Sequence, residues 1–171
     1  GDLDGDGDLD VVVAVTAGFS RIWVNQGLAQ GGTPGTFAEA GQELGTGSAR
    51  AVALADLDAD DDQDIFFLEH SPTGPYFHIW INQGGTQAGT RGTFLHKPQL
   101  TGDHSGSALA LGALDGDVSP DAFIVRSGSF PDTVWFNNAE GEFTSSGQAL
   151  GDENGMAVAL GDVDGDSDLD A

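Results

Sequence analysis

The sequence contains no cysteine, and only five of its 171 residues are Lys or Arg. Without cysteine, a disulfide framework and metal sites built on thiolates are both excluded. Nucleic acids and anionic membrane surfaces bind proteins through clustered Lys and Arg, so the few scattered basic residues argue against both as partners. The sequence also has no run of about 20 apolar residues, which a membrane helix requires, so we expect no membrane insertion.

Acidic residues are abundant instead, because 28 Asp and Glu give the chain a formal net charge of −23 at pH 7. A disordered acidic chain is disfavoured, since 39% of the residues are hydrophobic and they recur in short runs such as Val11–Val13. The length suits a single domain with a sizeable core. Carboxylates gathered around cations explain the acidic excess if the Asp residues recur in register.

Segments rich in Asp do recur, four times along the chain. Counted from Asp4, Asp58, Asp115 and Asp164, they are spaced by 54, 57 and 49 residues. This period fits a four-stranded sheet with its turns and is too long for the shorter solenoid repeats. The four segments span residues 2–10, 56–64, 113–121 and 162–170.

Each Asp-rich segment is followed by short apolar runs that carry the signals of β-strands. No stretch sustains the i, i+3, i+4 pattern of a helix, so we predict an all-β fold with four strands per repeat. We expect Trp23, Trp80 and Trp135 to fill the core between adjacent sheets. The repeat after the second Asp-rich segment serves as the example. Its four predicted strands are Ile65–Leu68, Ile79–Asn82, the segment beginning at Gly92–Phe94, and Ala108–Leu111.

The spacing of the carboxylates matches what calcium requires, which is six to eight oxygen ligands supplied by a tight loop. Side chains at loop positions 1, 3, 5 and 9 supply most of them, and the main-chain carbonyl of position 7 supplies another. Turns with merely solvated carboxylates are disfavoured, because so many Asp within nine residues repel one another without a cation. The candidate ligands are Asp2, Asp4, Asp6, Asp8 and Asp10; Asp56, Asp58, Asp60, Asp62 and Asp64; Asp115, Asp117, Ser119 and Asp121; and Asp162, Asp164, Asp166, Asp168 and Asp170.

Other metal sites fit the pattern less well. An EF-hand requires Glu at position 12 and flanking helices, but that position is Val13, Phe67 or Ile124 in a predicted strand. Magnesium demands stricter octahedral geometry, and zinc prefers His or Cys. We therefore expect about three to four Ca²⁺ ions, with the third site weakest because Ala113 replaces its first ligand and Val118 occupies position 6.

The motif Asp-x-Asp-Gly-Asp-x-x-x-Asp before a strand, with Trp-x-Asn and Gly-x-Phe at fixed offsets, resembles the FG-GAP/VCBS repeats of integrin-alpha-like β-propellers over essentially the whole chain. The resemblance implies blades of four antiparallel strands, with the calcium loop between strands 1 and 2. The resemblance further implies that residues 1–171 form one propeller segment, which consists of a partial blade (1–46), two blades (47–103 and 104–154) and the start of another (155–171). We expect a longer repeat array, or copies that complete each other's split blade.

This resemblance implies an extracellular or cell-surface module for adhesion or for binding a protein or glycan, with structural rather than catalytic calcium. We therefore expect no enzyme activity from the chain itself. Two alternatives stay open: a non-catalytic propeller of a polysaccharide-active enzyme, and an architectural repeat in which further copies of the chain are the partner. Among residues away from the Asp loops, Glu69, His70, Tyr76 and His78 are candidates for a glycan or peptide site, while His96 and His104 are expected to have packing roles.

Overall fold

The computed structural model describes residues 1–45, 48–70, 77–99, 106–151 and 154–171. Nearly all of its regular structure is β, which confirms the predicted all-β class, and the one helical element is a single 3₁₀ turn. In chain order the elements are β1 (Val11–Val13), β2 (Arg21–Asn25), β3 (Phe37–Glu39), β4 (Ala49–Ala55), β5 (Asp64–Glu69), β6 (Phe77–Asn82), η1 (Gly85–Gln87), β7 (Phe94–Lys97), β8 (Gly106–Gly112), β9 (Asp121–Arg126), β10 (Thr133–Asn137) and β11 (Phe143–Ser145).

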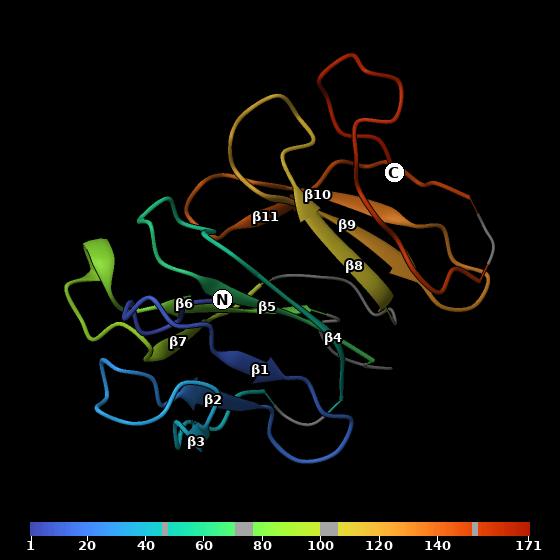
Figure 1. Cartoon of the computed structure of the whole chain (residues 1–171). Coiled ribbons are helices and arrows are strands. Elements are labelled where there is room, and N and C mark those ends of the chain that lie inside the picture. The colour runs from blue at the N-terminus through green and yellow to red at the C-terminus, as the bar shows by residue number, and fades with distance from the viewer. Residues whose placement is uncertain (46–47, 71–76, 100–105, 152–153) are drawn as a thin grey trace.

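The strands form three antiparallel sheets, each built from consecutive strands (Figure 1). The sheets have the orders β1-β2-β3, β4-β5-β6-β7 and β8-β9-β10-β11. In both four-stranded sheets an Asp-rich loop joins the first strand to the second, because the carboxylate at its ninth position already belongs to the second strand. The chain therefore repeats one meander unit, as the period of the sequence predicts.

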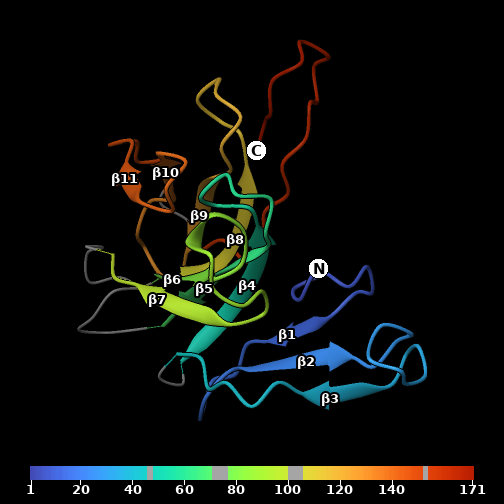
Figure 2. The same ribbon diagram turned by 90° about the vertical axis from the view of Figure 1, so that its left-hand side faces the viewer.

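The sheets are stacked in chain order, with β4-β5-β6-β7 between the other two (Figure 2). Because side chains alternate between the two faces of a strand, β5 serves both neighbours. Ile65 and Phe67 pack toward the first sheet, whereas Phe66 and Leu68 pack toward the third. This explains why every residue of β5 is buried and why Ile65–Leu68, between Asp64 and Glu69, are apolar without alternation.

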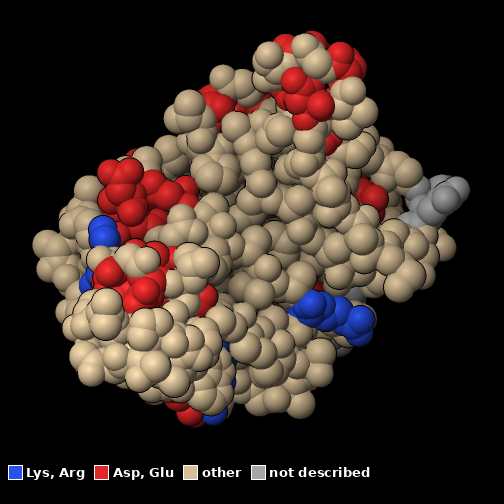
Figure 3. All heavy atoms as spheres, in the orientation of Figure 1, with Lys and Arg blue, Asp and Glu red and all other residues tan. Residues whose placement is uncertain are grey.

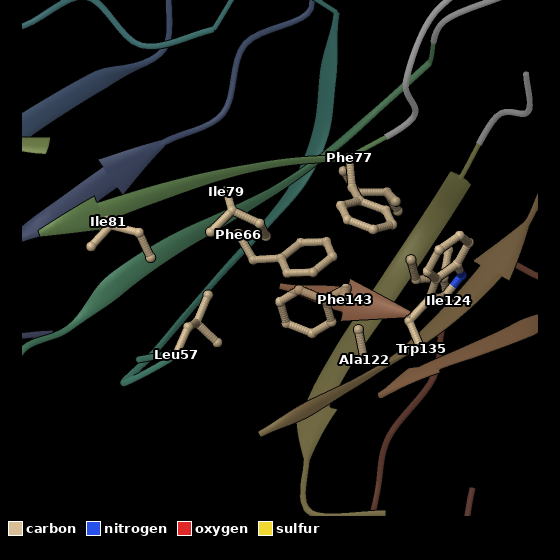
Figure 4. Packing of buried hydrophobic residues seen from close by; sticks show 10 residues of the cluster. Leu57, Phe66, Phe77, Ile79, Ile81, Ala122, Ile124, Trp135 and Phe143 are labelled. Atoms are coloured by element: carbon tan, nitrogen blue, oxygen red, sulfur yellow. The ribbon is translucent and has the colours of Figure 1, made fainter. Parts of the chain in front are cut away.

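Aromatic rings fill the interface between the two four-stranded sheets (Figure 4). Phe66 of the middle sheet meets Phe143 of the third sheet edge to face, with 5.3 Å between ring centroids. Phe77 packs edge to face on Trp135 at 5.2 Å. Such pairs add about 0.5–1.5 kcal/mol each beyond the burial of apolar area, so this interface is a main source of stability.

The tryptophans follow the prediction in part. Trp135 is buried between the second and third sheets, and Trp80 packs against the core between the first and second. Trp23 occupies the same position of the repeat but is 37% exposed, so its predicted core role is wrong. The reason is that its side of the first sheet carries no further sheet among the described residues.

A second difference concerns the start of a further unit, which we expected within residues 155–171 and which would begin with the segment Ala157–Leu160. The described residues show no strand there, and only an isolated bridge joins Gly161 to Asp170. In the other repeats this segment pairs with the strand that follows the Asp-rich loop.

No helix within the described ranges has the length and apolar character needed to cross a membrane.

Candidate metal centres

The four Asp-rich loops project from strand ends, and their side chains form separate acidic patches along the left and upper sides of the surface (Figure 3). Each loop is folded by its own carboxylates. In the second loop, Asp56 accepts hydrogen bonds from the main-chain amides of Asp60 at 3.1 Å and Asp61 at 3.0 Å. Asp2 and Asp162 accept equivalent bonds in the first and fourth loops. The carboxylate at position 1 thus organises the bend around itself.

The carboxylate at position 9 closes the loop against the sheet. Asp64 accepts hydrogen bonds from the amide of Leu57 at 2.8 Å, across the loop, and from the amide of Asn82 at 2.7 Å, on β6. Asp10 and Asp121 make the same pair of bonds in their repeats. Both oxygens of this carboxylate therefore hold the loop in place, which fixes the positions of the side chains between positions 1 and 9.

Two left-handed residues give the loop its curvature. Position 4 has a positive φ in all four loops, at Gly5, Ala59, Gly116 and Gly165. Position 6 has a positive φ at Gly7, Asp61 and Ser167, but not at Val118. A β-branched residue resists the left-handed conformation, so the third loop follows a different path at this point and Val118 is 95% exposed.

The bends bring carboxylate oxygens together in three of the loops. Within each of three groups, one oxygen from every residue lies within 4.8 Å of the others; the groups are Asp2, Asp4 and Asp6; Asp56, Asp58 and Asp64; and Asp162, Asp164 and Asp170. Among the described residues, the third loop forms no such group. That Ca²⁺ binds weakest at the third loop stays a prediction.

Burial disfavours the charged carboxylates of the second group when no cation is bound. Burial first, and then the charges of Asp60 and Asp56, raises the pKa of Asp58 to about 6. Burial also raises the pKa of Asp64 to about 7, although two main-chain amides donate to its carboxylate. In addition, Asp58 Oδ1 is buried without a hydrogen-bond partner. A cation among these oxygens would satisfy that atom and offset the repulsion, so the donor set fits a hard, oxygen-loving metal.

The remaining predicted ligands differ in their surroundings. Asp60 and Asp62 are buried, and Asp62 forms an ion pair with Arg91. Ser119 is buried as well, and its amide donates to Asp117 at 2.7 Å. The carboxylates at positions 3 to 7 of the fourth loop, Asp164, Asp166 and Asp168, are exposed, and Asp8 is half-buried. Coordination through the main-chain carbonyl of position 7 stays a prediction.

The sequence did not reveal that side-chain amides support the loops. Gln30 donates to Asp4 at 3.0 Å and contacts Asp6, and Gln87 contacts Asp58 in the next repeat. The Trp-x-Asn motif, which indicated only a strand end, also joins the repeats. Asn82 donates to the carbonyl of Leu3 in the preceding Asp-rich loop at 2.9 Å. The available signal was the recurrence of Gln at an equal distance after Trp23 and Trp80 of the Trp-x-Asn motif.

Away from the Asp loops, the structure joins some of the other candidate residues. Glu69 and His78 lie together, with 3.4 Å between the carboxylate and Nε2, whereas His70 is exposed. His96, which we assigned only a packing role, lies beside His78, and burial together with the charge of His78 lowers its pKa. Tyr76 and His104 lie outside the described residues.

Comparison with known families gives one match. The model of the FG-GAP-like repeat matches residues 2–67 and 114–171, which together make up most of the chain. The first range begins at the first residue of the first Asp-rich loop, and the second range begins at the second residue of the third loop. All the candidate metal ligands therefore lie within the matched ranges. No curated protein matches the chain.

Proposed function

Because the chain belongs to the FG-GAP-like repeat family, we propose that it is a calcium-stabilised β-propeller module that binds a protein or glycan outside the cell. Its Asp-rich loops hold Ca²⁺ in a structural role, and the chemistry of the module is binding rather than catalysis. The observation that carries the proposal is the convergence of three carboxylates in three separate loops of a chain with net charge −23.

Calcium is the cation that best suits these loops. Each cluster offers only oxygen donors, and the hydrogen bonds to positions 1 and 9 leave the loop preformed around them. Calcium accepts six to eight oxygens in flexible geometry, whereas Mg²⁺ keeps most of its waters. Because the loop is already folded, little conformational entropy is lost when the ion binds. The free energy of ion binding therefore adds to the stability of the folded state.

We propose that the three sheets are propeller blades. The blades comprise residues 47–103 and 104–154, with a partial blade at 1–46 and the start of another at 155–171. Support comes from the way equivalent residues of successive sheets are buried. Phe67 of β5 and Ile124 of β9 occupy the same position of the repeat, and each packs on the preceding sheet. Face-to-face packing of successive four-stranded meanders is the arrangement from which propellers are built.

An extracellular or cell-surface location follows from the proposed metal. Extracellular calcium modules have dissociation constants of about 10⁻⁴ to 10⁻³ M, so they are occupied outside the cell and empty in the cytosol. Stabilisation by bound calcium then confines the fully ordered module to the exterior. A partner would bind the loops at the strand ends opposite the calcium loops.

A second candidate function is assembly of copies into an architectural array. The outer side of the first sheet exposes Val11, Val13, Trp23 and Phe37, each 37–44% accessible, although the equivalent residues of the middle sheet are buried or packed against the core. Such a surface suits another sheet of the same kind. Light scattering at rising concentration tests this function: a constant monomer mass contradicts it, and a Trp23→Ser variant should lower any increase in mass.

Hydrogen exchange of the metal-free protein, measured with and without added Ca²⁺, tests the leading proposal. We expect Ca²⁺ to slow exchange of the amides in the first, second and fourth loops, with smaller effects in the third. The exposed turn around Gly18 serves as an internal control, because it joins β1 to β2 at the end of β1 opposite the first Asp-rich loop. Exchange that is identical in both conditions in all four loops would contradict a structural role for calcium.

A further inference from the structure

Two histidines of the middle sheet face each other at short range. His78 on β6 and His96 on β7 are diagonal neighbours on one side of the sheet, because His96 pairs directly with Trp80. Their nitrogens, His78 Nδ1 and His96 Nε2, are 2.9 Å apart, and the ring centroids are 5.1 Å apart. Two imidazole nitrogens at this separation share a proton, and at a slightly larger separation they can bind one metal ion.

A buried carboxylate lies on the far side of the first imidazole. Glu69, the last residue of β5, is 3% exposed, and its Oε2 is 3.4 Å from His78 Nε2. The hydroxyl of Ser48 donates to the same Oε2 at 3.2 Å. The carboxylate favours the tautomer with the proton on Nε2, which leaves the Nδ1 lone pair of His78 directed toward His96.

This arrangement has the form of a carboxylate–histidine–metal unit. In metal sites the imidazole that binds the ion commonly donates its other N–H to a carboxylate, which fixes the ring and makes it a stronger ligand. Two nitrogens bound to one tetrahedral Zn²⁺ at about 2.0–2.1 Å are separated by about 3.3 Å. The imidazoles therefore need to part by only a few tenths of an ångström to admit an ion.

We propose that His78 Nδ1 and His96 Nε2 bind one divalent transition-metal ion of the Zn²⁺ class, with Glu69 as the residue that orients His78. The other coordination positions face a cavity of about 210 Å³ that is lined by Gly45, His78, Trp80 and His96. Water or a small ligand in the cavity would complete the coordination.

The proposed site is distinct from the Asp-rich loops in place and in chemistry. His78 and His96 lie on β6 and β7 and Glu69 ends β5, whereas the second loop precedes β5, so no residue of the proposed site belongs to an Asp-rich loop. Imidazole nitrogen favours Zn²⁺, Ni²⁺ and Cu²⁺, whereas the loops offer only oxygen, which suits Ca²⁺. Calcium in excess therefore fills the loops and leaves the histidines for the second metal.

Calorimetric titration of the calcium-saturated protein with ZnCl₂ tests the proposal. We expect one Zn²⁺ per chain for the wild type and for His70→Gln, a matched control because His70 is an exposed histidine. His78→Gln and His96→Gln should each abolish this binding, and Glu69→Gln should weaken it about tenfold. Unchanged calcium-dependent melting would show that the variants are folded.

A second readout locates the ion. The Trp80 ring centroid is 5.1 Å from that of His96, so Cu²⁺ at the site should quench Trp80 fluorescence, and Trp80→Phe should remove that part of the quenching. Absence of Zn²⁺ binding in the wild type would overturn the proposal. Equal Zn²⁺ binding by the wild type and both histidine variants would overturn it as well, because the ion would then lie elsewhere. Either failure leaves the calcium sites untouched.

Discussion

The side-chain amide of Asn137 donates a 2.9 Å hydrogen bond to the main-chain carbonyl of Leu57, which lies 80 residues earlier in the chain. Asn82 makes the same bond to Leu3 in the preceding repeat. Each asparagine comes from the Trp-x-Asn motif of one sheet, and each carbonyl belongs to position 2 of the previous Asp-rich loop. The end of β6 or β10, the third strand of its sheet, is thereby hydrogen-bonded to the Asp-rich loop of the preceding repeat.

Asn137→Ala should lower the free energy of unfolding by about 0.5–1.5 kcal/mol, because the carbonyl of Leu57 loses one of its two donors and keeps the amide of Gly141 at 2.8 Å. The matched control is Asn138→Ala, since Asn138 is exposed and bonds only within its own turn. Urea denaturation in saturating calcium measures both variants. Equal stability of the two variants would show that the asparagine bond does not join the repeats.

Asp170→Asn should remove one bound calcium ion, whereas Asp168→Asn should not. Asp170 belongs to the three-carboxylate group of the fourth loop and accepts the amide of Val163 at 2.9 Å. Asp168 occupies position 7, where the main-chain carbonyl is the predicted ligand, so its side chain is dispensable. The number of ions bound, measured by calorimetry, distinguishes the two. Loss of an ion in both variants would contradict the assigned role of position 7.

The metal-free protein should become less stable as the pH rises between about pH 4 and pH 7. Burial raises the pKa of Asp64 to about 7 and that of Asp58 to about 6 in the folded state, above the ordinary value of 3.8. The folded state therefore binds more protons than the unfolded state in this window, so rising pH favours unfolding. Repulsion within the acidic chain acts in the same direction.

Saturating calcium should reverse this dependence, because the ion binds the deprotonated carboxylates and competes with protons. Urea midpoints at about pH 5 and about pH 8, with and without calcium, measure both slopes. A metal-free protein that gains stability toward pH 8 would contradict the proton linkage assigned to Asp58 and Asp64.

Ala113→Asp combined with Val118→Gly should strengthen calcium binding at the third loop. The first change supplies the missing carboxylate at position 1, and the second allows the left-handed conformation that position 6 has in the other loops. Met156→Ala, at an exposed position outside the loop, is a suitable control. An affinity of the third loop that stays at the wild-type value in the double variant would show that something other than these residues limits the site.

The sequence predicted the strands well, because the period of the Asp-rich segments located each one relative to a recurring landmark. Phe37, Phe94 and Phe143 of the Gly-x-Phe units each begin a strand. The exposure of Trp23 and the unpaired state of Ala157–Leu160 could not be predicted in this way. The repeat pattern describes only a unit that packs between two neighbouring units. Burial and pairing at the outer units depend on partners, which a local pattern does not contain.

The candidate site was predictable as far as the loop itself extends. Position 1 and position 9 carboxylates, such as Asp56 and Asp64, organise the bend through local hydrogen bonds that follow from spacing. The contact between His78 and His96 depends on the register of β6 on β7, which no motif in the sequence specifies. Side chains that meet across strands therefore had to come from the structure.

Calorimetric titration of the chelator-treated chain with Ca²⁺ tests the central claim most directly. The account predicts about three to four ions per chain, the last with the weakest affinity, together with a large rise in melting temperature. Absence of calcium binding at millimolar concentration would contradict it, and the Asp-rich loops would then be solvated turns that fold through their own hydrogen bonds.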